Sequence, residues 1–283
     1  MGYHKTLAIV LTLAGAACLP VTLTANSIQL DSTQFGHLDQ ANVTDCNNGG
    51  GGINSACGPT AVVNSLVFLQ NTYQAIYGTT LVPHTPGNTA IQDQTAVGQT
   101  LACYQSCGEN GTTIDEFING KEAYINSVAP NTTYFKVQNS FAPGGVDPTF
   151  NFLYSELVDR EDVELLVGFY SVNPTNGLLV RNGGHYITLT GISSATNDGN
   201  GTISFVDPSG GVDMNNIATF LATDGSIRTT AYLSGANPVT IIEAAVSESP
   251  IPEPATLFFM FGMIPVALLL RRFRPAAQRD QSN

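Results

Sequence analysis

The chain has 283 residues, which is enough for one sizeable domain, and 22 acidic against 10 basic side chains give it a net charge of −12. Half of the basic residues lie near the two ends, so the part between them carries about fifteen negative charges. A surface of that sign repels phosphate and excludes nucleic acid as an expected partner.

The first 25 residues have the layout of a secretory signal peptide. Two polar, basic positions, His4 and Lys5, precede an apolar stretch over residues 6–19, and small residues follow. This order is typical of a segment that is removed on export, and we expect cleavage after Ala25.

A helix is predicted to begin close to Cys57. The segment 60–70 has apolar residues at the three-to-four spacing of a buried helical stripe. Pro59 suits the first turn of a helix, where its missing N–H costs nothing. Cys57 is then placed at the helix N-terminus, where the dipole favours a thiolate.

The next segments divide the chain into a helical half and a strand-rich half. Helical patterns cover 95–104, 114–128 and 148–159, with Thr112 or Thr113 as the cap of the second. An apolar run over 163–170 indicates a strand buried on both faces. Further strands are expected at 185–192 and 202–206, which form a hairpin, and at 229–233 and 239–246. The expected fold class is therefore α+β.

The C-terminal part, 250–275, has a motif of its own. Pro252-Glu253-Pro254 precedes an uncharged apolar stretch over 255–270 and a basic tail that begins at Arg271. This order resembles the PEP-CTERM sorting signal of Gram-negative bacteria. The resemblance implies processing by an exosortase, transient anchoring in the inner membrane, and export to the outer envelope, the cell surface or the polysaccharide matrix. An ordinary membrane anchor is the alternative.

Four cysteines remain after removal of the signal: Cys46, Cys57, Cys103 and Cys107. An even number in an oxidising compartment usually forms disulfides. Cys103 and Cys107 are close enough in sequence to pair with each other, which leaves Cys46 and Cys57 paired or free. No histidine has metal-ligand spacing to these cysteines, so we expect no metal and no cofactor.

Three residues supply the groups that a thiol hydrolase needs. Cys57 is a nucleophile at a helix start, His185 lies at the head of a strand, and Asp207 ends the following strand. A histidine takes the thiol proton and later protonates the leaving amine, and a carboxylate holds the ring in the useful tautomer.

The motifs Cys57-Gly58-Pro59-Thr60, Gly184-His185 and Asp207-Pro208 together resemble the papain-like cysteine peptidases of the C39-like group. The resemblance spans about residues 34–210. It implies a domain over 26–249 in which the cysteine begins a central helix and the histidine and aspartate come from adjacent strands of an antiparallel sheet.

In that group a glutamine a few residues before the cysteine supplies an oxyanion donor. Here Gln40 precedes Cys57 by seventeen residues. The shorter spacing from Gln40 to Cys46 makes Cys46 a rival nucleophile, but no helical pattern follows Cys46. Cys57 with Gln40 as the donor is therefore the favoured assignment.

The sequence thus predicts an exported cysteine peptidase or amide hydrolase that acts on a peptide or protein. An acyl-transferring variant is disfavoured because the chain has no tryptophan after the cysteine. The alternative is a non-catalytic surface or matrix binding protein in which a Cys46–Cys57 disulfide consumes the thiol.

Overall fold

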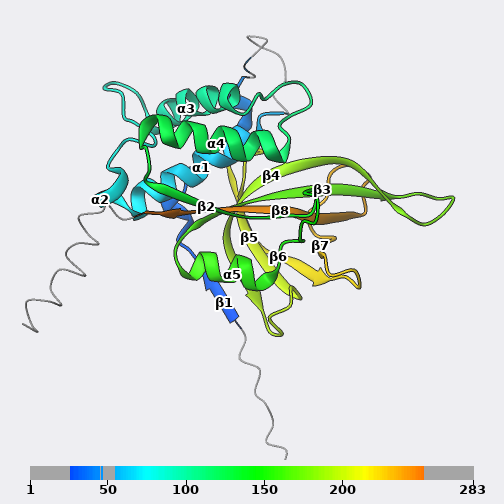
Figure 1. Cartoon of the computed structure of the whole chain (residues 1–283). Helices are drawn as coiled ribbons and strands as arrows, with labels where there is room; N and C mark the ends of the chain where they lie inside the picture. Colours follow the sequence, from blue (N-terminus) through cyan, green and yellow to red (C-terminus); the bar gives the residue numbers. More distant parts are fainter. Residues whose placement is uncertain (1–25, 45, 47–54, 252–283) are drawn as a thin grey trace, which may run out of the picture.

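The computed structural model describes residues 26–44, 46 and 55–251, and these residues form an α+β domain of helices and one antiparallel sheet (Figure 1). The α-helices are α1 (Cys57–Thr72), α2 (Gln74–Tyr77), α3 (Ala90–Tyr104), α4 (Ile114–Val128) and α5 (Phe150–Val158). The strands are β1 (Asn26–Gln29), β2 (Thr133–Asn139), β3 (Asp162–Val172), β4 (Leu179–Ser194), β5 (Gly201–Asp207), β6 (Val212–Leu221), β7 (Ile227–Thr229) and β8 (Val239–Pro250).

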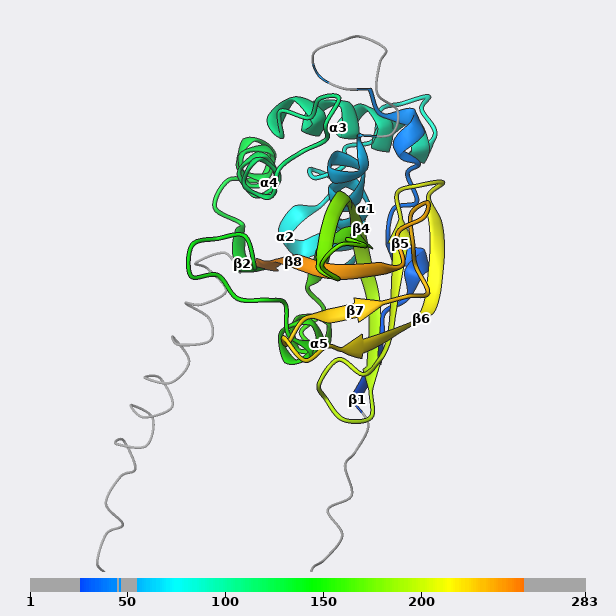
Figure 2. The same cartoon turned by 90° about the vertical axis from the view of Figure 1, so that its right-hand side faces the viewer.

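The sheet curls until its two ends meet. Its strand order runs β1-β4-β3-β8-β7-β6-β5, and β5 also pairs with β4, so β4, β3, β8, β7, β6 and β5 close a ring (Figure 2). Strand β2 extends the sheet by pairing with β8. Closure removes most free strand edges, which leaves few backbone groups for association with other chains.

Strands β3 and β4 are buried on both faces because each contributes to two cores. Leu165 and Val167 point into the interior of the curled sheet, where α5 also packs. Leu166, between them, faces the other way, into the core beneath α1, α3 and α4, and Tyr186 of β4 does the same. This alternation with a period of two explains the continuous apolar run in the sequence.

Helix α1 lies against β4 through a buried contact. The Thr188 hydroxyl donates to the carbonyl oxygen of Ala61 at 2.9 Å, and the two residues have no exposed surface. The helix begins at Cys57, as the sequence predicted, and Ala56 provides no side-chain cap. The start of α1 is thus held by contacts from the sheet and the surrounding core.

Helix α4 is fixed by both its start and its middle. Thr113, one of the two caps expected from the sequence, caps the helix and forms a capping box with Glu116. Lys121, in the third turn, is fully buried, and its ammonium contacts three carboxylates that are fully buried as well: Asp162, Glu164 and Glu248. One cation for three carboxylates favours protonation, and burial raises the pKa of Glu164 to about 7 and that of Glu248 well above its ordinary value.

Most predicted elements are confirmed, with differences at their ends, whereas three strands and the short helix α2 were not predicted. Helix α3 begins at Ala90, five residues before the helical pattern predicted over 95–104. Strand β7 ends at Thr229, where the sequence suggested a strand start. Strands β1, β2 and β6 were not predicted, because their half-exposed, polar residues lack a clear apolar face.

The expected signal over 1–25 and the apolar stretch over 255–270 lie outside the described residues. Among the helices that are described, none has both the length and the apolar character required to span a bilayer.

The buried carboxylates predict that the protein is more stable in mild acid than at neutral pH. A folded-state pKa raised from 4.5 to about 7 means that folded Glu164 holds a proton that the unfolded chain releases. The free energy of unfolding should therefore fall as pH rises from about 5 to 8, by up to about 1.4 kcal/mol per pH unit for each such group. Urea unfolding at several pH values measures this dependence.

Glu164→Gln should flatten the dependence, because the amide resembles the protonated acid. Glu122→Gln, an exposed position of α4 next to Lys121, is the matched control and should leave the slope as in the wild type. A wild-type stability that rises between pH 5 and 8 would contradict the argument.

Candidate active site

The structure brings Cys57, His185 and Asp207 together from three elements. Cys57 is the first residue of α1, His185 lies in the middle of β4, and Asp207 is the last residue of β5. Strands β4 and β5 are antiparallel neighbours whose pairing ends at Thr188–Val206, so Asp207 follows at the end nearest to His185. The arrangement of helix start and adjacent strands is the one that the sequence predicted.

The Asp207 carboxylate orients the histidine and is itself held by two further donors. Its Oδ1 lies 2.8 Å from Nε2 of His185 and accepts the backbone N–H of Ser209, also at 2.8 Å. Its Oδ2 accepts the Tyr232 hydroxyl at 2.7 Å. Burial would raise the pKa of Asp207, but these bonds and the charge of His185 hold it below its ordinary value.

With Nε2 turned to Asp207, the remaining ring nitrogen of His185, Nδ1, serves Cys57. Burial acts to lower the pKa of His185, yet its hydrogen bonds with Asp207 and with the Cys57 thiol raise it to about 10. Burial likewise acts to raise the pKa of Cys57, but the hydrogen bond and charge of His185 outweigh it and lower that pKa. Each group thus favours the charged form of the other, a thiolate beside an imidazolium.

Backbone donors add to the stabilisation of the thiolate. The Cys57 sulfur accepts hydrogen bonds from the N–H groups of Tyr186 and Gly58, which also lower its pKa. Its position in the first turn of a 16-residue helix adds the favourable end of the helix dipole. The nucleophile is thus activated by the strand that carries the histidine and by its own helix.

Cys57 opens into a cleft of about 620 Å³. One wall is the turn between α3 and α4, where Gly108 and Gly111 pair across a short bridge. The other wall is the sheet face that carries Leu166 and Tyr186. The Tyr186 ring stacks on Phe117 of α4, with centroids 4.3 Å apart, which joins the two walls behind the cleft. A cleft beside an activated thiol has the geometry for attack on a bound carbonyl.

Gln40 lies close to Asp207, the residue that orients the histidine. Its backbone N–H donates to the carbonyl oxygen of Pro208 at 2.8 Å, directly after Asp207, and its side chain is 8% exposed. Among the described residues no recorded hydrogen bond joins its amide to Cys57 or His185, and it does not line the cleft. Its oxyanion role stays a prediction.

A second glutamine, Gln105, was not considered from the sequence and lies nearer to the nucleophile. It is fully buried after the end of α3, and its Oε1 lies 3.2 Å from the place where a Cβ on Gly58 would be. Among the residues that the structure describes, its side-chain amide has no hydrogen-bond partner. No spacing in the sequence signals this approach, because it depends on how α3 packs against α1.

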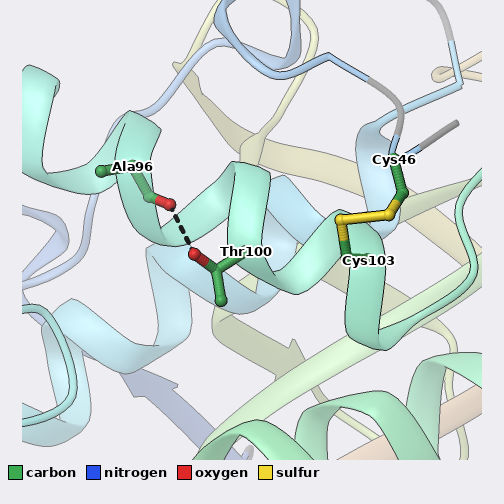
Figure 3. Close-up of a disulfide and its surroundings, with 4 residues drawn as sticks. All are labelled: Cys46, Ala96, Thr100 and Cys103. Carbon is green, nitrogen blue, oxygen red and sulfur yellow. Dashed lines mark hydrogen bonds between the residues drawn. A yellow bond between two sulfur atoms is a disulfide. The ribbon is translucent and has the colours of Figure 1, made fainter. Parts of the chain in front are cut away.

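The expected cysteine pairing is wrong. Cys46 forms a disulfide with Cys103, with an S–S distance of 2.18 Å (Figure 3). Cys57 has a free thiol. Cys103 sits on the exposed side of α3, one turn after the Thr100 hydroxyl that donates to Ala96. Cys107 follows the end of the helix, is buried, and donates from its sulfur to the Ser55 carbonyl oxygen. The helix end thus turns the two neighbouring cysteines in different directions.

This pairing settles two alternatives from the sequence. Cys46 cannot act as a rival nucleophile while its sulfur is bonded to Cys103, and it cannot consume Cys57. The sequence did not predict the hydrogen bond from the Tyr232 hydroxyl to Asp207. Tyr232 lies past the end of β7, and the packing of its ring on Phe205 brings it to the site.

Comparison of the chain with models of known protein families and with curated proteins found no match.

Alkylation of Cys57 should follow the state of His185. Wild-type protein should keep more of its pH 8 rate with iodoacetamide at pH 6 than His185→Ala does, because the lowered pKa of Cys57 preserves thiolate at the lower pH. In His185→Ala the pKa of Cys57 is raised by burial without the opposing effect of the histidine, so the alkylation rate at pH 6 should fall by about tenfold or more. Mass spectrometry of the Cys57 peptide gives the alkylation rate, and Cys57→Ala serves as the blank. Equal pH profiles for wild type and His185→Ala would refute the ion pair between Cys57 and His185.

The disulfide should stabilise the fold through the long loop that it closes. It joins residues 57 positions apart, and removal of such a bridge costs about 2–4 kcal/mol. Urea unfolding of Cys46→Ser/Cys103→Ser should show this loss, and a reductant should lower the stability of the wild type without affecting the variant. Peptide mapping without reduction should yield the Cys46–Cys103 pair, and a dominant Cys103–Cys107 pair would contradict the structure.

Proposed function

We propose that this chain is an exported cysteine peptidase, or a closely related amide hydrolase, of the papain-like C39-like group. The observation that carries the proposal is the His185 ring, which bonds both the Cys57 thiol and the Asp207 carboxylate at the mouth of a cleft. The surrounding fold supports it, since a central helix begins at the nucleophile and packs on a curled antiparallel sheet that supplies the other two residues.

The chemistry proceeds in two halves. The Cys57 proton resides on Nδ1 of His185, and the thiolate attacks the carbonyl carbon of a peptide bond. His185 then gives this proton to the leaving amine as the C–N bond breaks, which leaves a thioester on Cys57. The imidazole next takes a proton from water, the resulting hydroxide attacks the thioester, and the proton returns to the thiol pair as the acid product leaves. Asp207 stabilises the imidazolium without taking its proton.

The negative oxygen of the tetrahedral intermediate needs a donor near the start of α1. The first hydrogen bond of the helix is from Thr60 to Ala56, so the N–H of Cys57 has no partner within the helix. That N–H points from the positive end of the helix dipole and serves as one oxyanion donor. We assign the second donor to the Gln40 side chain by the resemblance to the family.

The proposed location and partners rest mainly on the sequence. The signal over 1–25 and the sorting motif that begins at Pro252 lie outside the described residues. The Cys46–Cys103 disulfide suits an oxidising compartment and is consistent with export. In this proposal an exosortase processes the C-terminal segment after transient anchoring in the membrane. The binding-protein alternative loses its premise, because Cys57 is not in a disulfide.

Activity should be visible as new peptide ends. The full chain, incubated with a complex mixture of peptides, should generate new termini that mass spectrometry detects. Cys57→Ala should produce none, and His185→Ala should cut about 10³-fold more slowly or worse. Digestion in ¹⁸O-labelled water should place the label in each new C-terminal carboxylate, because water resolves the thioester.

Glu122→Gln, an exposed change far from the site, is the matched control and should cut as the wild type does. New termini that persist in Cys57→Ala would exclude the thiol mechanism. Products without ¹⁸O, formed by transfer to an added amine, would indicate acyl transfer in place of hydrolysis.

A further inference from the structure

Two glycines face each other across β3 and β4, and one of them, Gly184, lines the cleft. The paired residues Leu166 and Tyr186 are followed along the same sheet face by the pair Gly168 and Gly184. A Cβ on Gly168 would lie 2.1 Å from a carboxylate oxygen of Glu243, and one on Gly184 would lie 2.3 Å from Nη2 of Arg181. The glycines therefore leave room for an ion pair on the floor of the cleft.

The Arg181 guanidinium is held from several sides. Its Nε donates to Oε1 of Glu243 at 2.7 Å and its Nη2 donates to Oε2 at 2.9 Å. Tyr170 fixes the same carboxylate through a 2.6 Å hydrogen bond to Oε1, and the Phe141 ring lies 5.6 Å from the guanidinium carbon. Glu243 is 2% exposed whereas the arginine side chain is 37% exposed. A fixed, half-exposed guanidinium has already lost the rotamer freedom that binding would otherwise cost.

One end of this guanidinium remains available. Within the described part of the chain no acceptor is recorded for Nη1 of Arg181, whereas its other two nitrogens are bonded to Glu243. Arg181 lines the same cleft as Cys57. The two N–H groups of Nη1 thus belong to a residue that lines this cleft and lies four positions before His185 in β4.

The charges around the cleft determine what Nη1 can bind. The bidentate Glu243 cancels the charge of Arg181, and two further lining residues, Glu109 and Glu116, are acidic. The Glu116 pKa is lowered by its bonds to Thr113, so this carboxyl is ionised at neutral pH. A carboxylate from a substrate would meet net negative charge here, whereas a neutral carbonyl oxygen or a basic side chain would not.

We propose that Arg181 is a specificity-determining residue of the cleft. Its Nη1 donates to a main-chain carbonyl oxygen of the peptide held for attack by Cys57. The Glu243 carboxylate fixes the guanidinium and neutralises its charge, so that acidic peptides gain no advantage. The substrate class is then an extended peptide with neutral or basic residues beside the scissile bond. This inference rests on the proposed peptidase function.

The test compares two reagents on the same thiol in the full chain. Iodoacetamide reports the thiolate alone, whereas blocked tripeptidyl chloromethyl ketones must also bind the cleft. Three such probes differ only in a Lys, Ala or Asp next to the reactive group, and the wild type should react in the order Lys, Ala, Asp. In Arg181→Lys, which keeps a cation for Glu243, the peptidyl rates should fall by about tenfold relative to the iodoacetamide rate for all three probes.

Arg228→Lys is the matched control, because Arg228 pairs with Asp224 outside the residues that line the cleft. Tyr170→Phe is a second variant that keeps both charges and should reduce the peptidyl rates in the same direction by a smaller factor. An unchanged ratio in both variants, or a loss confined to the Asp probe, would overturn the role of Arg181 while the thiol site stands. Failure of iodoacetamide to label wild-type Cys57 would instead remove the proposed function, and this inference with it.

Discussion

The His185 imidazole must reach two partners at once, and those partners belong to elements that meet only in the complete fold. Cys57 lies at the start of α1 on one side, and Asp207 ends β5 on the other. A hydrogen bond tolerates a few tenths of an ångström before it weakens. The placement of α1 on β4 and the pairing of β4 with β5 are therefore the constraints on which the chemistry of the site depends.

Each constraint has its own source of rigidity. Thr188 bonds the second turn of α1 to β4, three residues after His185, and closure of the sheet fixes β5 beside β4. Tyr232, which holds the far side of Asp207, packs its ring on Phe205 inside the curled sheet. The orienting carboxylate is thus supported by the interior of the sheet, while the nucleophile is supported by the helical core on the opposite face of β4. The histidine strand is the element that both cores share.

The sequence was sufficient for those parts of the site that depend on local chemistry. A helix start at Cys57 follows from the apolar spacing after Pro59, and Asp207 at a strand end follows from the β-prone run before it. The contacts that depend on packing could not be predicted in this way. Gln105 reaches the first turn of α1 only because α3 ends there, and the disulfide partner of Cys46 depends on which side of α3 Cys103 faces. Sequence spacing carries no information on such directions.

The glycines show how a local pattern can have a non-local cause. Gly183 and Gly184 before His185 are readily interpreted as a means of bringing the backbone close to the cleft. In the structure, the residue for which a side chain would clash is Gly184, and the obstacle is Arg181 of the same strand, held there by Glu243 of β8. The facing Gly168 is required for the same ion pair. The Glu243 carboxylate of this pair is buried and costly to desolvate, and two β-strand glycines give up packing to admit the pair. A fixed guanidinium in the cleft is the feature that this loss of packing makes possible, and it is the basis of the role proposed for Arg181.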